Sequence, residues 1–240
     1  MSDRRADLDR FYAMLDELEE RCGGKRRLAE CHGRMGWPRR GVYFFFEDGE
    51  VREDGVSPRV VRVGTHGLGA RKSTLWGRLS QHRGSTGGLM PGGGNHRGSI
   101  FRAHVGSALL ASGEWPEVIR CSWLVGSSAK PEVRMAEYPL ERAVSDRIGA
   151  MPFLWLEVDD LPGRDSHRGV IEADAIALLS NVDRVPIDPP SQGWLGRRAS
   201  RRLIRESGLW NVNHVQGESS GRFLSVFASR LAAMTRQSRR

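Results

Sequence analysis

The chain has 240 residues, of which 39% are hydrophobic, and this suits one globular domain with extensions. Its 37 Lys and Arg residues outnumber 29 Asp and Glu residues, the net charge is +8, and only three of the basic residues are Lys. Arginine-rich basic chains suit contacts with phosphate, although a GC-rich genome produces the same bias. Three scattered cysteines without a C-x-x-C pair suggest neither a disulfide framework nor a zinc knuckle. The chain has no apolar run long enough for a membrane span and no signal-peptide pattern, so we expect a cytoplasmic protein without a membrane partner.

The first quarter of the chain predicts a helix followed by a β-hairpin. Residues 3–21 repeat their large apolar side chains at helical spacing, and Gly23-Gly24 ends the pattern. Apolar runs at 41–46 and 59–64 are separated by a segment with two Asp-Gly pairs. Two β-rich runs with such a connection predict a hairpin over about 41–64.

The next helix carries a pair of candidate functional residues. We expect it over about 74–83, with Ser73 as its N-cap. Arg78 and His82 share one helical face at i, i+4 and could face the hairpin. His66 lies in the turn between the hairpin and this helix.

A glycine-rich segment follows, at residues 84–98. It lacks the Gly-Lys-Ser/Thr of a P-loop, so we exclude nucleotide binding there. We expect a flexible loop, and substrate contact through His96 and Arg97 is the alternative.

The middle of the chain predicts helices and strands in alternation. We expect helices over 99–111 and 131–149, the second broken or kinked at Pro139. Residues 118–125 predict a short strand and residues 151–158 a central one.

The last third predicts three helices. Residues 169–180 carry Glu172 in the first turn, where a carboxylate also suits the helix dipole. Residues 194–206 place four arginines on one face, a spacing that destabilises a bare helix, so we expect an anionic partner. A final amphipathic helix is expected over 221–235. The four arginines are Arg198, Arg201, Arg202 and Arg205.

This order of elements resembles the GIY-YIG nuclease domain. Gly41-Val42-Tyr43 matches the first motif, whereas Arg62-Val63-Gly64 has an arginine in place of the second tyrosine. Arg78 stands at the family's helix arginine, His82 matches a histidine of the restriction-endonuclease branch, and Glu172 matches the metal-binding glutamate. The resemblance implies an α/β (α+β) fold with a small antiparallel three-stranded sheet flanked by helices.

The resemblance also divides the chain. Residues 1–40 would form an N-terminal helix and basic arm, and residues 41–190 the nuclease-like domain with an insertion at about 84–131. Residues 191–240 would form a basic C-terminal helical extension.

The function implied is metal-dependent DNA endonuclease activity of a restriction or defence type, in a homodimer. Glu172 would hold Mg²⁺ or Mn²⁺. Tyr43 would activate or orient the attacking water with help from His82, and Arg78 would bind the scissile phosphate. The arginine face, His96 and Arg97 would contact DNA.

Several alternatives stay open at this point. Arg62 supplies a second positive charge or simply faces outward, and His66 is a rival general base. Asn181 stands in for the family's asparagine at an unusually short spacing from Glu172. Because the second tyrosine is missing, the alternative function is a catalytically inactive DNA-binding module. A metallohydrolase built from His66, His82 and His96 lacks a suitable ligand spacing.

Overall fold

The computed structural model describes residues 3–69, 73–163 and 166–234. Within these residues the centre is one antiparallel sheet with strand order β1-β4-β2-β3. A helix-flanked antiparallel sheet is confirmed, and the two-residue β1 extends the three predicted strands to four by pairing with β4. The strands are β1 (Arg26–Arg27), β2 (Gly41–Val51), β3 (Pro58–Gly64) and β4 (Pro152–Glu157).

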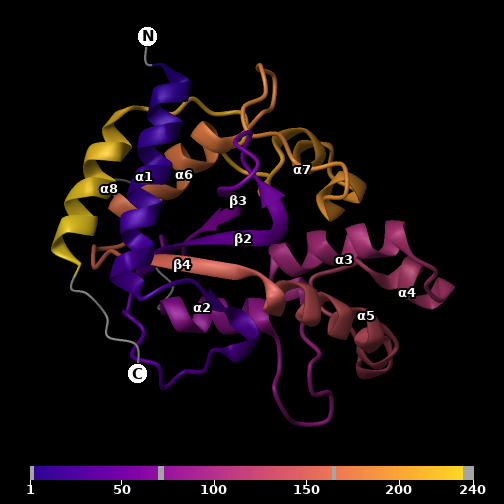
Figure 1. The fold of residues 1–240 in the computed structure, drawn as a ribbon. Coiled ribbons are helices and arrows are strands. Elements are labelled where there is room, and N and C mark those ends of the chain that lie inside the picture. The colour runs from indigo at the N-terminus through magenta and orange to yellow at the C-terminus, as the bar shows by residue number, and fades with distance from the viewer. Residues whose placement is uncertain (1–2, 70–72, 164–165, 235–240) are drawn as a thin grey trace.

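Helices cover both faces of this sheet (Figure 1). One layer contains α1 (Arg4–Cys22), α6 (His167–Leu179) and α8 (Arg222–Ala233). The other contains α2 (Leu75–Arg83), α3 (Ile100–Ser112) and α5 (Pro131–Ala150), with α4 (Glu117–Ser122) at its outer end. Among the described helices, none combines the length and apolar composition that a membrane crossing needs.

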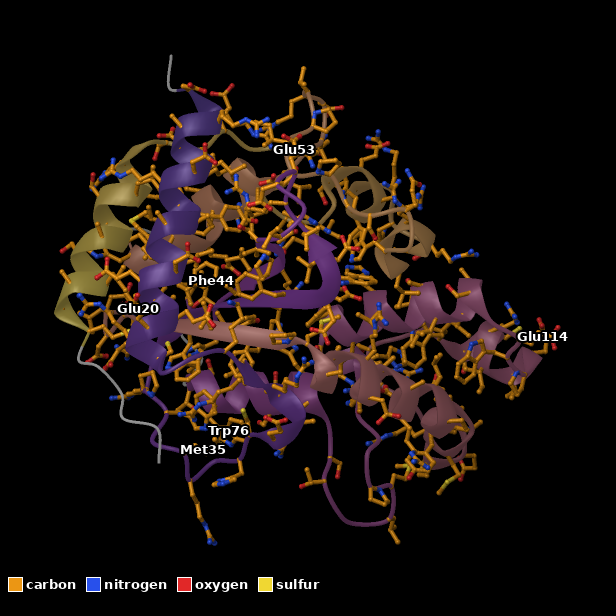
Figure 2. The ribbon with its side chains drawn as sticks, in the orientation of Figure 1. Glu20, Met35, Phe44, Glu53, Trp76 and Glu114 are labelled. Atoms are coloured by element: carbon orange, nitrogen blue, oxygen red, sulfur yellow. The ribbon has the colours of Figure 1, made fainter. Side chains whose placement is uncertain are left out.

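The continuous apolar run of β2 follows from this three-layer arrangement. Phe44 packs its ring against Phe11 of α1 and Phe227 of α8, and Figure 2 shows it on the α1 side. The next residue, Phe45, points to the other face and contacts Phe101 of α3. Successive side chains of a strand alternate between faces, so a strand buried on both sides is apolar at every position.

One predicted strand is wrong, and the break predicted within the confirmed helix over 131–149 is absent. Residues 118–125 contain most of α4 and the turn after it instead of a strand. This segment packs beside α3 and α5, and Trp123 in the turn donates Nε1–H to Ala103 O at 3.1 Å. Pro139 does not interrupt α5. The carbonyl that it leaves unpaired belongs to Met135, and both residues are exposed, so water can take the missing hydrogen bond.

The N-cap of α2 also differs from the prediction. Thr74, not Ser73, accepts the capping hydrogen bond, from Gly77 N at 3.0 Å. Ser73 instead lies with its hydroxyl oxygen 3.1 Å from His66 Nδ1. The residue expected to cap the helix thus holds a candidate functional side chain.

Candidate functional site

Tyr43 and His82 form a buried pair beneath the site. The Tyr43 hydroxyl lies 2.8 Å from His82 Nε2, and both side chains are 0% exposed. Burial, followed by the positive charge of Arg78, holds the pKa of His82 well below its usual range, so the ring is neutral. Its Nδ1 lies 2.8 Å from Ser99 Oγ, which already accepts the capping bond of α3 from Arg102 N. A neutral ring that donates from Nδ1 to Ser99 leaves Nε2 to accept the Tyr43 O–H.

Gly64 is required by the position of Tyr43. The two residues are partners across β2 and β3. A Cβ atom at Gly64 would lie 2.4 Å from the Tyr43 hydroxyl oxygen. Any other residue would displace the tyrosine, which gives a packing reason for the glycine that ends β3.

Arg62 is buried between the tyrosine and the open part of the site. Its guanidinium lies 4.5 Å from the centre of the Phe101 ring, and Nη1 donates to Trp210 O at 2.5 Å. Burial lowers the pKa of Arg62, while Tyr43 and Glu172 act in the opposite direction. Arginine remains charged under such conditions. Arg62 is therefore an inward positive charge, and not the outward-facing residue of the alternative interpretation.

Arg78 and Glu172 line the same two adjoining hollows. One of about 890 Å³ also contains the turn from Thr65 to Gly69, and one of about 180 Å³ also contains Arg62. Arg78 is half-buried, and its Nη1 donates to Gln81 Oε1 at 3.0 Å. Among the described residues that line these hollows, Tyr43 and His82 do not appear. Of the predicted residues, Arg78 and Glu172 thus line both hollows, whereas His66 lines only the larger one and Arg62 only the smaller one.

Glu172 lies in the second turn of α6 and does not cap its own helix. Ser166 is the N-cap, whereas Glu172 Oε1 accepts from Thr65 N across the site at 3.1 Å. Burial raises the pKa of the Glu172 carboxyl, although Arg62, His214 and Arg78 act to lower it. Nearby groups therefore compensate its negative charge incompletely.

A divalent cation fits this carboxylate. Mg²⁺ and Mn²⁺ prefer oxygen ligands, and Mg²⁺ commonly uses one or two carboxylates with waters and phosphate oxygens. No group of three or more His, Cys, Asp or Glu side chains in the described part of the chain could hold a metal by itself. The residues present therefore fit a divalent cation that has one protein carboxylate as a ligand, with water and substrate oxygens as its other ligands.

His66 lines the larger hollow and has one buried ring nitrogen without a partner among the described residues. Its Nδ1 is held by Ser73, and its Nε2 is buried without a hydrogen-bond partner among the described residues. Burial, followed by the charge of Arg168, lowers the pKa of His66 to about 4. A neutral ring with an unpaired nitrogen can accept a proton from a molecule that reaches it.

The C-terminal segment adds residues that the sequence prediction missed. Trp210 N donates to Val61 O at 2.7 Å, and the Asn211 amide bonds to both Val63 N (3.1 Å) and Val63 O (2.9 Å). These bonds cover the open edge of β3 and bring Asn213 and His214 to the smaller hollow with Glu172. The available signal was the run of polar residues Asn211, Asn213 and His214 within an apolar stretch.

Asn181 lies away from this site. Its side-chain oxygen accepts from Arg4 Nη2 at 3.1 Å and from Ile187 N at 2.9 Å. These bonds tie the end of α6 to α1, which is a structural role.

His96 and Arg97 are also engaged within the protein. His96 is 2% exposed, and both its backbone N and its Nδ1 lie within 3.0 Å of Glu141 Oε1. Arg97 donates to both oxygens of Glu137, at 2.7 and 2.8 Å. This burial contradicts their expected placement on a substrate-contacting loop, and we drop them from the proposed DNA contacts.

The four arginines of the C-terminal segment do not share one helical face. The segment is split into a 3₁₀ turn (Leu195–Arg198) and α7 (Arg202–Ser207). Arg202 is paired with Glu206, and Arg205 donates to Ala199 O at 2.6 Å. Arg198 and Arg201 are exposed and make no side-chain hydrogen bond or ion pair with the described residues.

A family model described as the GIY-YIG domain matches residues 2–237. No curated protein and no solved structure gives a significant match. The match covers nearly the whole chain, including the segments on both sides of the central sheet. The chain therefore belongs to the GIY-YIG domain family, and membership of this family suggests a nuclease.

Proposed function

We propose that the protein is a divalent-metal-dependent DNA endonuclease. The observation that carries the proposal is the meeting of Arg78 and Glu172, from two different helices, at hollows that lie next to the Tyr43–His82 pair. The guanidinium of Arg78 and the carboxylate of Glu172 at a solvent-open site match the needs of phosphodiester hydrolysis. A restriction-type role, a homodimer and a cytoplasmic location are parts of the same proposal.

Arg78 binds the phosphate and stabilises the negative charge that grows on it. Glu172, with water and phosphate oxygens, would hold Mg²⁺ or Mn²⁺, which would supply Lewis-acid polarisation of the phosphate. Substrate binding must first open a path from the hollow to the buried Tyr43 hydroxyl. Tyr43 then passes its proton to His82 Nε2, at 2.8 Å, and the resulting phenolate takes the proton of the attacking water. The buried charge of Arg62 stabilises the negative charge that develops on the tyrosine oxygen.

A catalytically inactive DNA-binding module is the second candidate. It is favoured by one observation: Tyr43 is wholly buried, with Arg62 at the position of the missing tyrosine. In that case Arg78 and the exposed arginines would bind a backbone without cleavage.

Glu172→Gln separates the two candidates. Supercoiled plasmid is incubated with the wild-type protein or the variant, with Mg²⁺, with Mn²⁺ or with EDTA. We expect metal-dependent nicking by the wild type and a loss of more than about 10²-fold in the variant, with DNA binding at low salt retained. Binding without nicking by the wild type would support the inactive module, and full activity of the variant would remove Glu172 from the mechanism.

A further inference from the structure

The glycine-rich segment between α2 and α3 is an anchored loop, not the flexible one expected. Ser85 N donates to Gly93 O at 2.7 Å, and Gly92 N donates to Ser85 O at 2.8 Å, which closes the loop at its base. Tyr138 of α5 donates its hydroxyl to Pro91 O at 2.7 Å. These bonds hold the loop against α5.

The base of the loop rests on a buried ion pair. Arg102 is 0% exposed and donates to the Glu141 carboxylate at 2.6 Å and to Ser145 Oγ at 3.0 Å. Gly94 lies directly on this guanidinium, where a Cβ atom would be 2.2 Å from Cζ of Arg102. The glycine is thus required by close approach to a fixed charged group.

The tip of this anchored loop presents an apolar side chain to solvent. Leu89 is 96% exposed, and the adjacent Met90 is half-buried. A single exposed leucine is ordinary on a protein surface. Here both residues border a hollow, so they can contact a molecule that binds in it.

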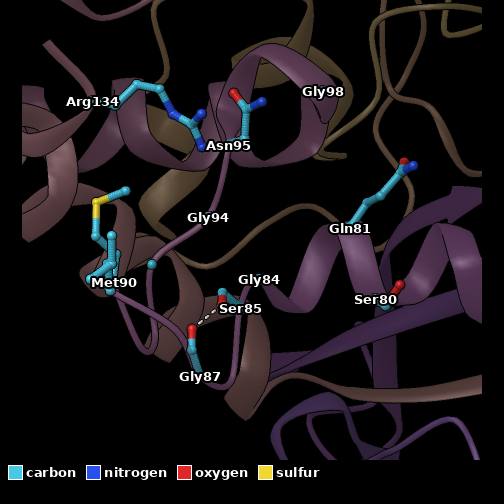
Figure 3. A pocket seen from close by; sticks show the side chains of 12 residues that line it. Ser80, Gln81, Gly84, Ser85, Gly87, Met90, Gly94, Asn95, Gly98 and Arg134 are labelled. Atoms are coloured by element: carbon cyan, nitrogen blue, oxygen red, sulfur yellow. Dashed lines mark hydrogen bonds between the residues drawn. The ribbon is translucent and has the colours of Figure 1, made fainter. Parts of the chain in front are cut away.

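The hollow beneath the loop has a volume of about 520 Å³ and adjoins the proposed catalytic site. Gln81 and Gly98 line both this hollow and the one that contains Arg78 and Glu172. Arg134 and Asn95 lie on one side of it, and Gln81 of α2 lies on another (Figure 3). A chain bound at Arg78 can therefore extend into it.

The polar lining can recognise the edge of a flat heterocycle. Gln81 uses its Oε1 to accept from Arg78, and Asn95 uses its Oδ1 to accept from Arg97 N, so both retain an NH₂ group for donation. An amide NH₂ group can donate to the acceptor atoms on a base edge. Leu89 and Met90 offer apolar surface for a ring face.

We propose that this hollow binds an unstacked nucleobase of the strand whose phosphate lies at Arg78 and Glu172. The inference rests on the proposed function. Leu89 enters the base stack as an apolar wedge, as such side chains do in other DNA complexes, and Arg134 neutralises a neighbouring phosphate. A base that is already unpaired avoids the cost of unstacking, so distorted DNA binds more tightly than a perfect duplex.

The test compares three DNA ligands by fluorescence anisotropy, in EDTA to prevent cleavage. They are a short perfect duplex, the same duplex with one unpaired thymine, and the same duplex with an abasic residue at that position. We expect the wild type to bind the thymine bulge about tenfold more tightly than the other two. Leu89→Ser should abolish this preference without affecting folding, because the side chain is exposed. Val56→Ser is the matched control, since Val56 is 80% exposed in the turn at the far end of β3 and should leave the preference intact.

The outcomes separate this inference from the proposed function. Equal binding of the three ligands, or an undiminished preference in Leu89→Ser, overturns the base-binding site while duplex binding stands. Failure to bind any of the three ligands overturns the DNA-directed function itself. Arg134→Gln should weaken the binding of all three ligands by a similar factor, because a phosphate contact does not distinguish them, and unchanged binding of all three would remove Arg134 from the assignment.

Discussion

At the scale of single residues, the Tyr43 hydroxyl is the most discriminating group. Tyr43→Phe keeps the ring in contact with Phe45 and removes the hydroxyl that bonds to His82 and interacts with Arg62. Loss of a general base typically lowers the rate by about 10²–10⁴. We expect a decrease of that order in single-turnover cleavage, with nearly unchanged DNA affinity and melting temperature. The double variant with His82→Ala should lose less than the sum of the single losses, since the two act as a unit.

His66 is the rival candidate for the general base in this experiment. His66 lines the open hollow, which the buried Tyr43 does not, and its Nε2 has no partner among the described residues. Cleavage at the wild-type rate by Tyr43→Phe, together with an inactive His66→Ala, would assign the base to the turn after β3.

A further prediction at this scale concerns His214, which the C-terminal segment brings to the site. It shares the smaller hollow with Glu172 and Arg78 and is exposed, so its imidazole can donate a proton to the leaving oxygen. We expect His214→Ala to lower cleavage of DNA by about 10²-fold, within the range typical of general acids. An aryl phosphodiester with a good leaving group needs no such proton and should be hydrolysed at an almost unchanged rate. The exposed Glu218→Ala is the control, and equal losses on both substrates would give His214 a binding role instead.

At the scale of elements, the split between the 3₁₀ turn and α7 divides the arginines into two kinds. Arg198 and Arg201 are exposed without partners among the described residues, whereas Arg202 is paired with Glu206. The Arg198→Gln, Arg201→Gln double variant should reduce the slope of log affinity against log salt by about 0.9 for each lost phosphate contact. Arg202→Gln should change the slope less. Identical slopes for wild type and double variant would mean that these arginines do not bind DNA.

At the scale of the whole molecule, buried neutral histidines predict a stability that falls in mild acid. Burial lowers the pKa of His66 and of His104 from 6.5 to about 4, and that of His82 well below 6.5. The unfolded chain binds these protons below about pH 6.5 while the folded protein does not, so unfolding becomes more favourable as the pH falls from 6.5 toward 4. Each such histidine contributes up to about 1.4 kcal/mol per pH unit.

Thermal unfolding between about pH 8 and pH 5 measures this effect. The acids Glu137 and Glu141 have lowered pKa values and are protonated only below this window. His104→Gln should reduce the slope of the unfolding free energy against pH by the contribution of one proton. His32→Gln, at an exposed position, should leave this slope unchanged. A flat profile across the window would show that these histidines are not held neutral.

Several features of the fold and site could be predicted because they depend on local pattern. An apolar run on β2, helical spacing in α1 and α8, and the i, i+4 pair Arg78–His82 are properties of neighbouring residues. The break at Pro139 was predicted wrongly because the effect of a proline on a helix depends on whether water reaches the freed carbonyl.

The sequence by itself determined the family, the strand that carries Tyr43, the glycine opposite it, and the helix that carries Glu172. Only the tertiary structure decided which charged groups meet. It paired His96 with Glu141, split the arginine segment, buried Arg62 beside Tyr43, and brought His214 to Glu172 along the edge of β3. These outcomes depend on contacts between residues far apart in the chain, for which neither spacing nor propensity carries a signal. Desolvation then sets the protonation of the groups that meet, and burial is likewise a property of the folded molecule.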